Sequence, residues 1–298
     1  MTPIIEIKNA NDFLAISWMI GARCNYDCSY CGPSYHNSTE KPHSLAKLKK
    51  AWKNLFSKIE HSKQNIKLHI LGGEPTINKS LIPWLSWIRE EYPKVVKILV
   101  TTNGSATYNL YEKLSKVVDT INFSMHREFI DEDKFFNKVI KLNSTVDENK
   151  LIWVWVMQAS DKDKKWFDIL EKNNIKYFKQ RVVDWSIKEP KIYHDKFENH
   201  SDYDCQITLQ SGEKYSILCN EVSNRHLGLF KDWMCVAGSK RLFVDQYFNI
   251  FSCEGRNNKL GNLLMDWKPL TEPVACRKDF CFCTDDLQID KWNARVVK

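Results

Sequence analysis

The chain has 298 residues, of which 43% are hydrophobic and 27% are charged, with a formal net charge of +7 at pH 7. This is the composition of a soluble globular protein, with room for one large domain and an appended smaller one. No segment has the length and apolarity of a signal peptide or a membrane span, so we expect no membrane partner. Ten cysteines without an export signal predict a reducing, cytoplasmic setting and metal binding.

The first two thirds of the chain alternate strand-like and helix-like segments. The strand-like segments are residues 13–20, 66–71, 95–100, 120–126, 151–157 and 175–183. Helical periodicity covers residues 45–61, 81–91, 107–117, 133–142 and 161–173. Six strands that alternate with helices predict an α/β fold in which a parallel sheet curls into a partial, TIM-like (β/α)6 barrel. In such folds the loops after the strands build the site.

The loop after the first strand carries Cys24, Cys28 and Cys31 at the spacing Cys-x3-Cys-x2-Cys. A tetrahedral zinc site needs four ligands, and its cysteines usually come with a second set downstream. Three thiolates within eight residues instead suit a cubane iron–sulfur cluster that leaves one iron open for chemistry. A structural zinc knuckle or a chance group of buried thiols is the alternative.

A second pattern, Gly72-Gly73-Glu74-Pro75, follows the second strand directly, and its glycines permit the close approach of a ligand. This turn, the cysteine spacing and the aromatic Tyr30 before the third cysteine together resemble the radical S-adenosylmethionine (radical SAM) superfamily. The resemblance implies that the three cysteines hold a [4Fe–4S] cluster whose open iron binds SAM. Electron transfer then cleaves SAM to methionine and a 5'-deoxyadenosyl radical.

The same resemblance implies further SAM contacts at the strand ends. The GGE turn would bind the SAM amino group, Thr102 and Asn103 the ribose or the carboxylate, and Ser124 would act similarly. His126 and Gln158 also follow strands, and for them a structural role is an equal alternative. The expected cofactor-binding residues are Tyr30, Gly72, Gly73, Glu74, Thr102, Asn103, Ser124 and Gln158.

After Trp185 the pattern changes, and the polar segment 186–204 predicts a linker between a domain at 1–185 and a second domain at 205–298. The second domain begins with two β-prone runs around a glycine-containing turn, which predict a hairpin with Cys205 and Cys219 at its open end. In a reducing cell we expect free thiols there instead of a disulfide. Either thiol is a candidate catalytic residue that returns a hydrogen atom to a substrate radical.

The last third holds a second cysteine set around another hairpin pattern. It resembles the twitch or SPASM extension of radical SAM enzymes, although Phe248 replaces a usual glycine and the tail reads Cys-x4-Cys-x-Cys. The resemblance implies one auxiliary [4Fe–4S] cluster on two hairpin cysteines and two of three tail cysteines, of which we favour Cys281 and Cys283. A four-thiolate zinc site is the alternative. The five candidates are Cys235, Cys253, Cys276, Cys281 and Cys283.

The resemblance predicts the reaction type better than the substrate. It implies an oxidoreductase that abstracts a hydrogen atom from its substrate and takes electrons from a donor such as flavodoxin or ferredoxin. A ribosomally made peptide is the first expected substrate, for oxidation, cross-linking or epimerisation, and a small molecule such as an amino-sugar is the second. Modification of RNA is a weaker possibility, because its support is the net charge alone and the lysines are dispersed along the chain. A non-catalytic, zinc-stabilised binding protein is the alternative from another class.

Overall fold

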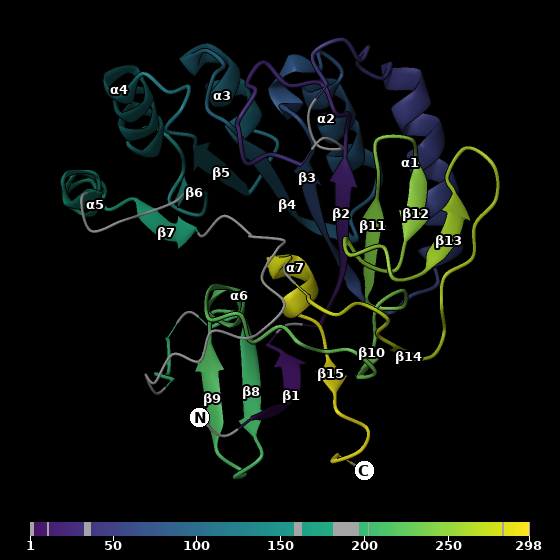
Figure 1. Cartoon of the computed structure of the whole chain (residues 1–298). Coiled ribbons are helices and arrows are strands. Elements are labelled where there is room, and N and C mark those ends of the chain that lie inside the picture. The colour runs from purple at the N-terminus through teal and green to yellow at the C-terminus, as the bar shows by residue number, and fades with distance from the viewer. Residues whose placement is uncertain are drawn as a thin grey trace.

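Two β-sheets organise the described part of the chain, which comprises residues 3–10, 12–32, 37–157, 163–180, 197–201, 203–281 and 283–297 of the computed structural model. One sheet has nine strands and the other has six. Figure 1 shows the six-stranded sheet below the nine-stranded one, with both chain ends on its lower side. The predicted site residue Gln158 lies outside the described residues.

The large sheet confirms the predicted alternation of strands and helices. Its consecutive strands are β2 (Phe13–Met19), β3 (Asn65–Leu71), β4 (Val95–Thr102), β5 (Thr120–Met125), β6 (Leu151–Met157) and β7 (Lys176–Gln180). The helices between them are α1 (Leu45–Ile59), α2 (Leu81–Glu91), α3 (Tyr108–Ser115), α4 (Glu132–Asn143) and α5 (Lys164–Lys172). Neighbouring strands pair in parallel, and the sheet remains open, so the fold is an α/β partial barrel.

Apolar side chains alternate along these strands and face the helices, which cover one side of the sheet (Figure 1). At the centre of this layer the rings of Trp18, Trp52 and Trp84 are fully buried, with Trp18 lying 6.1 Å and 5.1 Å from the other two centroids. Ser44 is the N-cap of α1, since its hydroxyl accepts a hydrogen bond from the Lys47 amide at 3.4 Å. The opposite, concave face of the strands carries polar residues such as Ser17, His69 and Thr101, together with the Trp153 and Phe178 rings.

Three later strands extend the large sheet, which the sequence pattern does not predict. These are β11 (Arg241–Val244), β12 (Asn249–Phe251) and β13 (Lys259–Asn262). The predicted hairpin of β11 and β12 is confirmed, but β11 also pairs in parallel with β2, with Val244 opposite Trp18. In contrast, β1 (Ile4–Asn9) is not part of the large sheet and pairs within the small one. Most of the segment 186–204 lies outside the described residues, and the domain boundary there stays a prediction.

The small sheet contains the other predicted hairpin, with Cys205 opposite Ile217. Its strands, besides β1, are β8 (Cys205–Leu209), β9 (Lys214–Ile217), β10 (Met234–Cys235), β14 (Val274–Ala275) and β15 (Lys291–Trp292). Two short helices accompany it, α6 (Asn220–Asn224) and α7 (Thr284–Leu287). Figure 1 shows α7 between the two sheets, where it can connect the small sheet to the concave face of the barrel.

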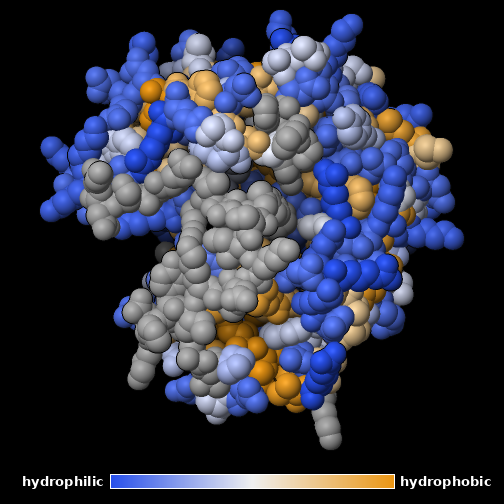
Figure 2. Space-filling view, viewed as in Figure 1, coloured by the Kyte–Doolittle hydropathy of each residue, from blue (hydrophilic) through white to orange (hydrophobic). Residues whose placement is uncertain are grey.

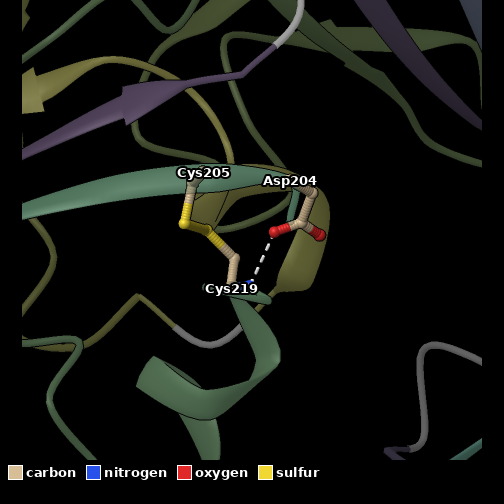
Figure 3. Close-up of side chains that lie close together, drawn as sticks. All are labelled: Asp204, Cys205 and Cys219. Carbon is tan, nitrogen blue, oxygen red and sulfur yellow. Dashed lines mark hydrogen bonds between the residues drawn. A yellow bond between two sulfur atoms is a disulfide. The ribbon is translucent and has the colours of Figure 1, made fainter. Parts of the chain in front are cut away.

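Cys205 and Cys219 form a disulfide, so the expectation of two free thiols is wrong (Figure 3). The hairpin register brings their Cα atoms to 6.0 Å, within the range that a disulfide spans. Both side chains are fully buried in the core of the small sheet, and the Cys219 amide donates to Asp204 Oδ1 at 2.7 Å. With both sulfurs in the bond, neither residue has a thiol to serve as the predicted hydrogen donor.

The surface carries few features that bear on partners. On the face in Figure 2 it is largely hydrophilic, with an apolar area over strands of the small sheet. Among the described residues, no helix is both long enough and apolar enough to cross a membrane.

Phe248, the residue that replaces a usual glycine, has a φ of 64°, in the left-handed region that favours glycine. Its ring is 1% exposed and lies 6.2 Å from Trp18 and 4.5 Å from His43, so burial offsets the strained backbone.

We expect Phe248→Gly to lower the free energy of unfolding by about 2–3 kcal/mol, because the lost ring outweighs the relieved strain. Phe248→Ala loses the ring and keeps the strain, and should be less stable than the glycine variant by about 1 kcal/mol. Urea denaturation measures both differences. A glycine variant as stable as the unchanged protein would contradict this account.

Candidate functional site

The three clustered cysteines lie in one cavity of about 210 Å³ at the C-terminal ends of β3, β4 and β5. The structure therefore brings together loops that are far apart in the sequence, as the fold class predicts. Of the predicted cofactor-binding residues, the cavity is lined by Gly72, Gly73, Thr102, Asn103 and Ser124.

The cysteine thiols sit close enough to influence one another. Burial raises the pKa of Cys28 to about 11, with smaller contributions from Cys31 and Cys24, and burial likewise raises the pKa of Cys31 to about 11. Cys24 Sγ faces two donors, the Tyr26 amide at 3.4 Å and Asn103 Nδ2 at 3.8 Å. A metal centre displaces such thiol protons, and three thiols that line one cavity, with donors aimed at one of them, fit a cluster bound by three thiolates.

Gly72 and Gly73 allow the turn after β3 to lie directly against the cysteine loop. A Cβ atom at Gly72 would stand 2.4 Å from the Gly21 carbonyl oxygen, and one at Gly73 would stand 2.3 Å from that of Arg23. The two segments are also joined by hydrogen bonds, from the Gly73 amide to Gly21 O at 2.9 Å and from the Glu74 amide to Arg23 O at 2.7 Å. Only glycine fits both positions, so the turn fixes the place of the cysteine loop.

The Glu74 carboxylate is 3% exposed and does not line this cavity. It accepts hydrogen bonds from the Thr102 hydroxyl at 2.7 Å, the Asn103 amide at 2.6 Å and the Thr76 hydroxyl at 2.6 Å. Burial raises its pKa, while these bonds lower it. The carboxylate thus ties the turn after β3 to the end of β4, and its predicted contact with SAM stays a prediction.

An aromatic group closes one side of the cavity. Tyr30 and His126 stack at 5.9 Å, with 2.7 Å between the Tyr30 hydroxyl and His126 Nδ1, and Tyr26 stacks on Phe129 at 5.1 Å. Burial lowers the pKa of His126 to about 4, so at neutral pH its uncharged ring can accept a hydrogen bond from the Tyr30 hydroxyl. The sequence analysis missed Glu128, which accepts hydrogen bonds from the amide and hydroxyl of Ser29 at 2.8 Å and 2.6 Å and so anchors the cysteine loop.

A buried polar chain leads from the cavity to α7. Thr101, which lines the cavity, lies 2.7 Å from His69 Nε2, and His69 Nδ1 lies 2.6 Å from Asp285 Oδ2. The Ser17 hydroxyl donates to the same carboxylate oxygen at 2.8 Å. The sequence analysis missed this chain, although polar residues at alternate strand positions are a signal of a polar concave face.

Arg241 links the same region to the cysteines of the tail. Its guanidinium is fully buried and donates to Asp286 Oδ1 at 2.9 Å and to Ser17 Oγ at 2.8 Å. Its Nη2 also lies 3.9 Å from Cys283 Sγ. The tail is therefore held against the barrel by a charged contact that no local sequence pattern reveals.

The second cysteine set surrounds a separate site. Cys283 does not line it, because its thiol donates to Glu254 Oε2 at 2.7 Å. The pKa of Cys283 is raised by burial and then by the Glu254 and Asp286 carboxylates. Cys276 therefore lies at this site, whereas Cys283, one of the two tail cysteines favoured from the sequence, does not line it. The thiols that line the site are Cys235, Cys253, Cys276 and Cys281.

These four thiols fit a four-thiolate centre. Burial raises the pKa of Cys253 to about 12, with smaller contributions from the Asp286 carboxylate and from Cys235. Lys291 is buried beside them, and its ammonium caps α7 by donating to the carbonyls of Asp286, Leu287 and Ile289 at 2.7–3.0 Å. Its charge favours the thiolate forms of Cys235 and Cys281.

Comparisons with known proteins agree on the barrel. Residues 18–149 match the family model of the radical SAM superfamily. The probable GTP 3',8-cyclase of Pyrococcus abyssi is 32% identical over 116 residues, which is 38% of this chain and 34% of that protein. The GTP 3',8-cyclase of Campylobacter curvus is 26% identical over 137 residues, 43% of this chain and 41% of that protein. The chain thus spans well under half the length of these curated relatives.

Two solved structures share the fold. Streptococcus suis SuiB bound to S-adenosylmethionine has a TM-score of 0.54 at 14% identity, covering 86% of this chain and 64% of that one. A histidine-tagged form of anSMEcpe with bound AdoMet has a TM-score of 0.55 at 14% identity, covering 85% and 78%. At this identity the likeness supports the α/β partial barrel alone. The family match makes residues 18–149 similar to the radical SAM superfamily, and the two structures share the fold of this part of the chain.

Proposed function

We propose that the protein binds a [4Fe–4S] cluster on Cys24, Cys28 and Cys31 and reductively cleaves SAM in the cavity that these residues line. The observation that carries this proposal is the shared cavity of three thiols and the Gly72–Gly73 turn. When bound, the cluster supplies the electron that converts SAM into methionine and a 5'-deoxyadenosyl radical, which abstracts a hydrogen atom from the substrate. An external donor such as flavodoxin or ferredoxin provides that electron.

The residues of the chain orient SAM and exclude water. The Gly72–Gly73 backbone lies beside the cysteine loop, where it can bind the SAM amino group without steric hindrance. The side chains of Asn103 and Ser124 line the wall from the next two strand ends, within reach of the ribose or the carboxylate. Tyr30 holds His126 in place at the rim.

An auxiliary [4Fe–4S] cluster on Cys235, Cys253, Cys276 and Cys281 is the second part of the proposal, with the domain 205–298 as its twitch-like support. The support for it is the site lined by four thiols. Such a centre would accept an electron from the substrate radical or help to position the substrate. The Cys205–Cys219 disulfide argues against epimerisation through either of those thiols and leaves oxidation or cross-linking as the favoured outcome.

A ribosomally made peptide is the proposed substrate. In support, one structure with the same fold is anSMEcpe with bound AdoMet and the Cp18Cys peptide, at a TM-score of 0.53 and 14% identity. A small molecule is the second candidate, because the curated relatives are named GTP 3',8-cyclases.

The test is anaerobic reconstitution followed by reduction with dithionite in the presence of SAM. We expect about eight irons per chain and release of 5'-deoxyadenosine, detected by chromatography. A colourless protein that holds zinc and leaves SAM intact would contradict the proposal. Addition of GTP tests the second candidate, since consumption of GTP together with SAM would favour it over a peptide.

A further inference from the structure

We propose that Lys67, Lys97 and Lys176, on the concave face of the barrel, form a binding site for an anionic group of the substrate. We call these three residues the lysine site. The inference rests on the proposed function, because it assumes that the substrate of the radical reaction lies against the concave face. It adds to that function the chemical class of the substrate.

The strand register places two of these lysines side by side. In the parallel pair of β3 and β4, Lys67 is the direct partner of Lys97. Ile66, Leu68 and Ile98 pack into the core under the helices, so both lysines project from the concave face, as His69 does. Like charges directly opposite each other destabilise a sheet. The arrangement therefore needs negative charge nearby.

Among the residues that the structure describes, a carboxylate supplies that charge to Lys67 but not to Lys97. Lys67 Nζ lies 3.8 Å from Asp285 Oδ1 and 3.3 Å from Gln288 Oε1. The carboxylate that acts on Lys97 is that of Asp119. It already pairs with Arg89 and with Lys150 at 3.7 Å, and it accepts a hydrogen bond from the Ile98 amide at 2.7 Å.

Within the described ranges, the Lys97 ammonium has no hydrogen bond and no ion pair, although the side chain is half-buried. Burial lowers the pKa of Lys97, and the charges of Lys67 and Lys176 also lower it. A partly buried cation without a counter-charge destabilises the fold. A bound anion would remove that cost, and this is the observation that points to a ligand.

The third lysine brings an aromatic surface. Lys176 is the register partner of Trp153 on β6, and its ammonium lies 5.4 Å from the Trp153 ring centroid. The Trp153 ring stacks on Phe178 at 4.6 Å with an interplanar angle of 6°. The lysine site therefore borders an apolar wall, which suits an anionic group attached to an apolar or planar body.

The position of Lys67 along β3 sets the distance that such a substrate must span. Lys67 is four residues before Leu71, which lines the cavity of the three cysteines. Four residues of a strand span about 13 Å. A substrate held at the lysine site by a phosphate or a carboxylate would thus present a carbon about that far away to the radical.

Calorimetry on the anaerobically reconstituted protein tests the site with two probes, inorganic pyrophosphate and the peptide Glu-Glu-Glu. We expect one or both to bind, and Lys97→Met to weaken binding roughly tenfold. The control Lys113→Met, on the exposed side of α3, should bind as the unchanged protein does. Tighter binding of pyrophosphate identifies a phosphate ligand, and tighter binding of the peptide identifies carboxylates. Equal affinity with and without Lys97, or no binding of either probe, overturns the proposal.

Two further readouts separate this site from its alternatives. Lys97→Met should unfold at the same urea concentration as the unchanged protein or a higher one, because it removes an unpaired cation, whereas a lysine with a structural role would lower the midpoint. The second readout is SAM cleavage by the unchanged protein. Anion binding without any SAM cleavage in the unchanged protein would reject the proposed function and leave the lysine site standing.

Discussion

The variant Cys28→Ala, reconstituted anaerobically, is expected to release no 5'-deoxyadenosine from SAM above the level of a reaction without protein. Cys28 is 7% exposed and lies in the same cavity wall as Cys24 and Cys31, with no fourth cysteine among the lining residues to replace it. Two thiolates do not hold a cubane cluster that needs three. Iron should therefore fall from about eight to about four per chain, with the auxiliary site still loaded.

The matched control is the double variant Cys205→Ala/Cys219→Ala, which removes two cysteines far from this cavity. It should keep its iron and its SAM cleavage, while losing about 3 kcal/mol of stability with the disulfide. Circular dichroism confirms that both variants are folded. A Cys28→Ala protein that cleaves SAM at the unchanged rate would show that the three-cysteine loop is not the site.

The barrel could be predicted from the sequence because its signals are local. Most strands of the β2–β7 series are short, largely apolar runs that end at a turn, and each helix carries its apolar residues at helical spacing. The parallel order then follows from the alternation of strands and helices. The pairing of β11 with β2 could not be predicted, because it joins residues more than two hundred positions apart and depends on packing against Trp18.

The candidate site also has a part that could be predicted from the sequence and a part that could not. The cysteine spacing and the glycine turn follow strands directly, so their meeting in one cavity is a consequence of parallel topology. The His69–Asp285 contact, in contrast, depends on where α7 inserts, and four helical residues carry no periodicity to read. The disulfide was missed for a different reason. The expectation of free thiols comes from the reducing compartment, which acts on cysteines through the solvent. Cys205 and Cys219 are fully buried in a hairpin that holds them together.

The last prediction concerns which tail cysteine holds the auxiliary cluster. Cys276→Ser is expected to lower iron from about eight to about four per chain, and Cys283→Ser to leave about eight. Cys276 lines the four-thiol site, while Cys283 donates to Glu254 and lies beside Arg241. The two variants are a matched pair, since each removes one sulfur from the same tail. Elemental analysis measures the iron content and the zinc content of each sample separately.

The reverse result, loss of four irons with Cys283→Ser alone, would restore Cys281 and Cys283, the pair that the sequence analysis favours. One zinc per chain in the unchanged protein, lost with Cys276→Ser, would keep the ligand set and replace the cluster with a structural zinc. In that case the auxiliary site could not accept an electron, because zinc has no redox chemistry. The identity of the metal at Cys276 therefore decides between an oxidative enzyme and one that uses the second site only to fold or to position its substrate.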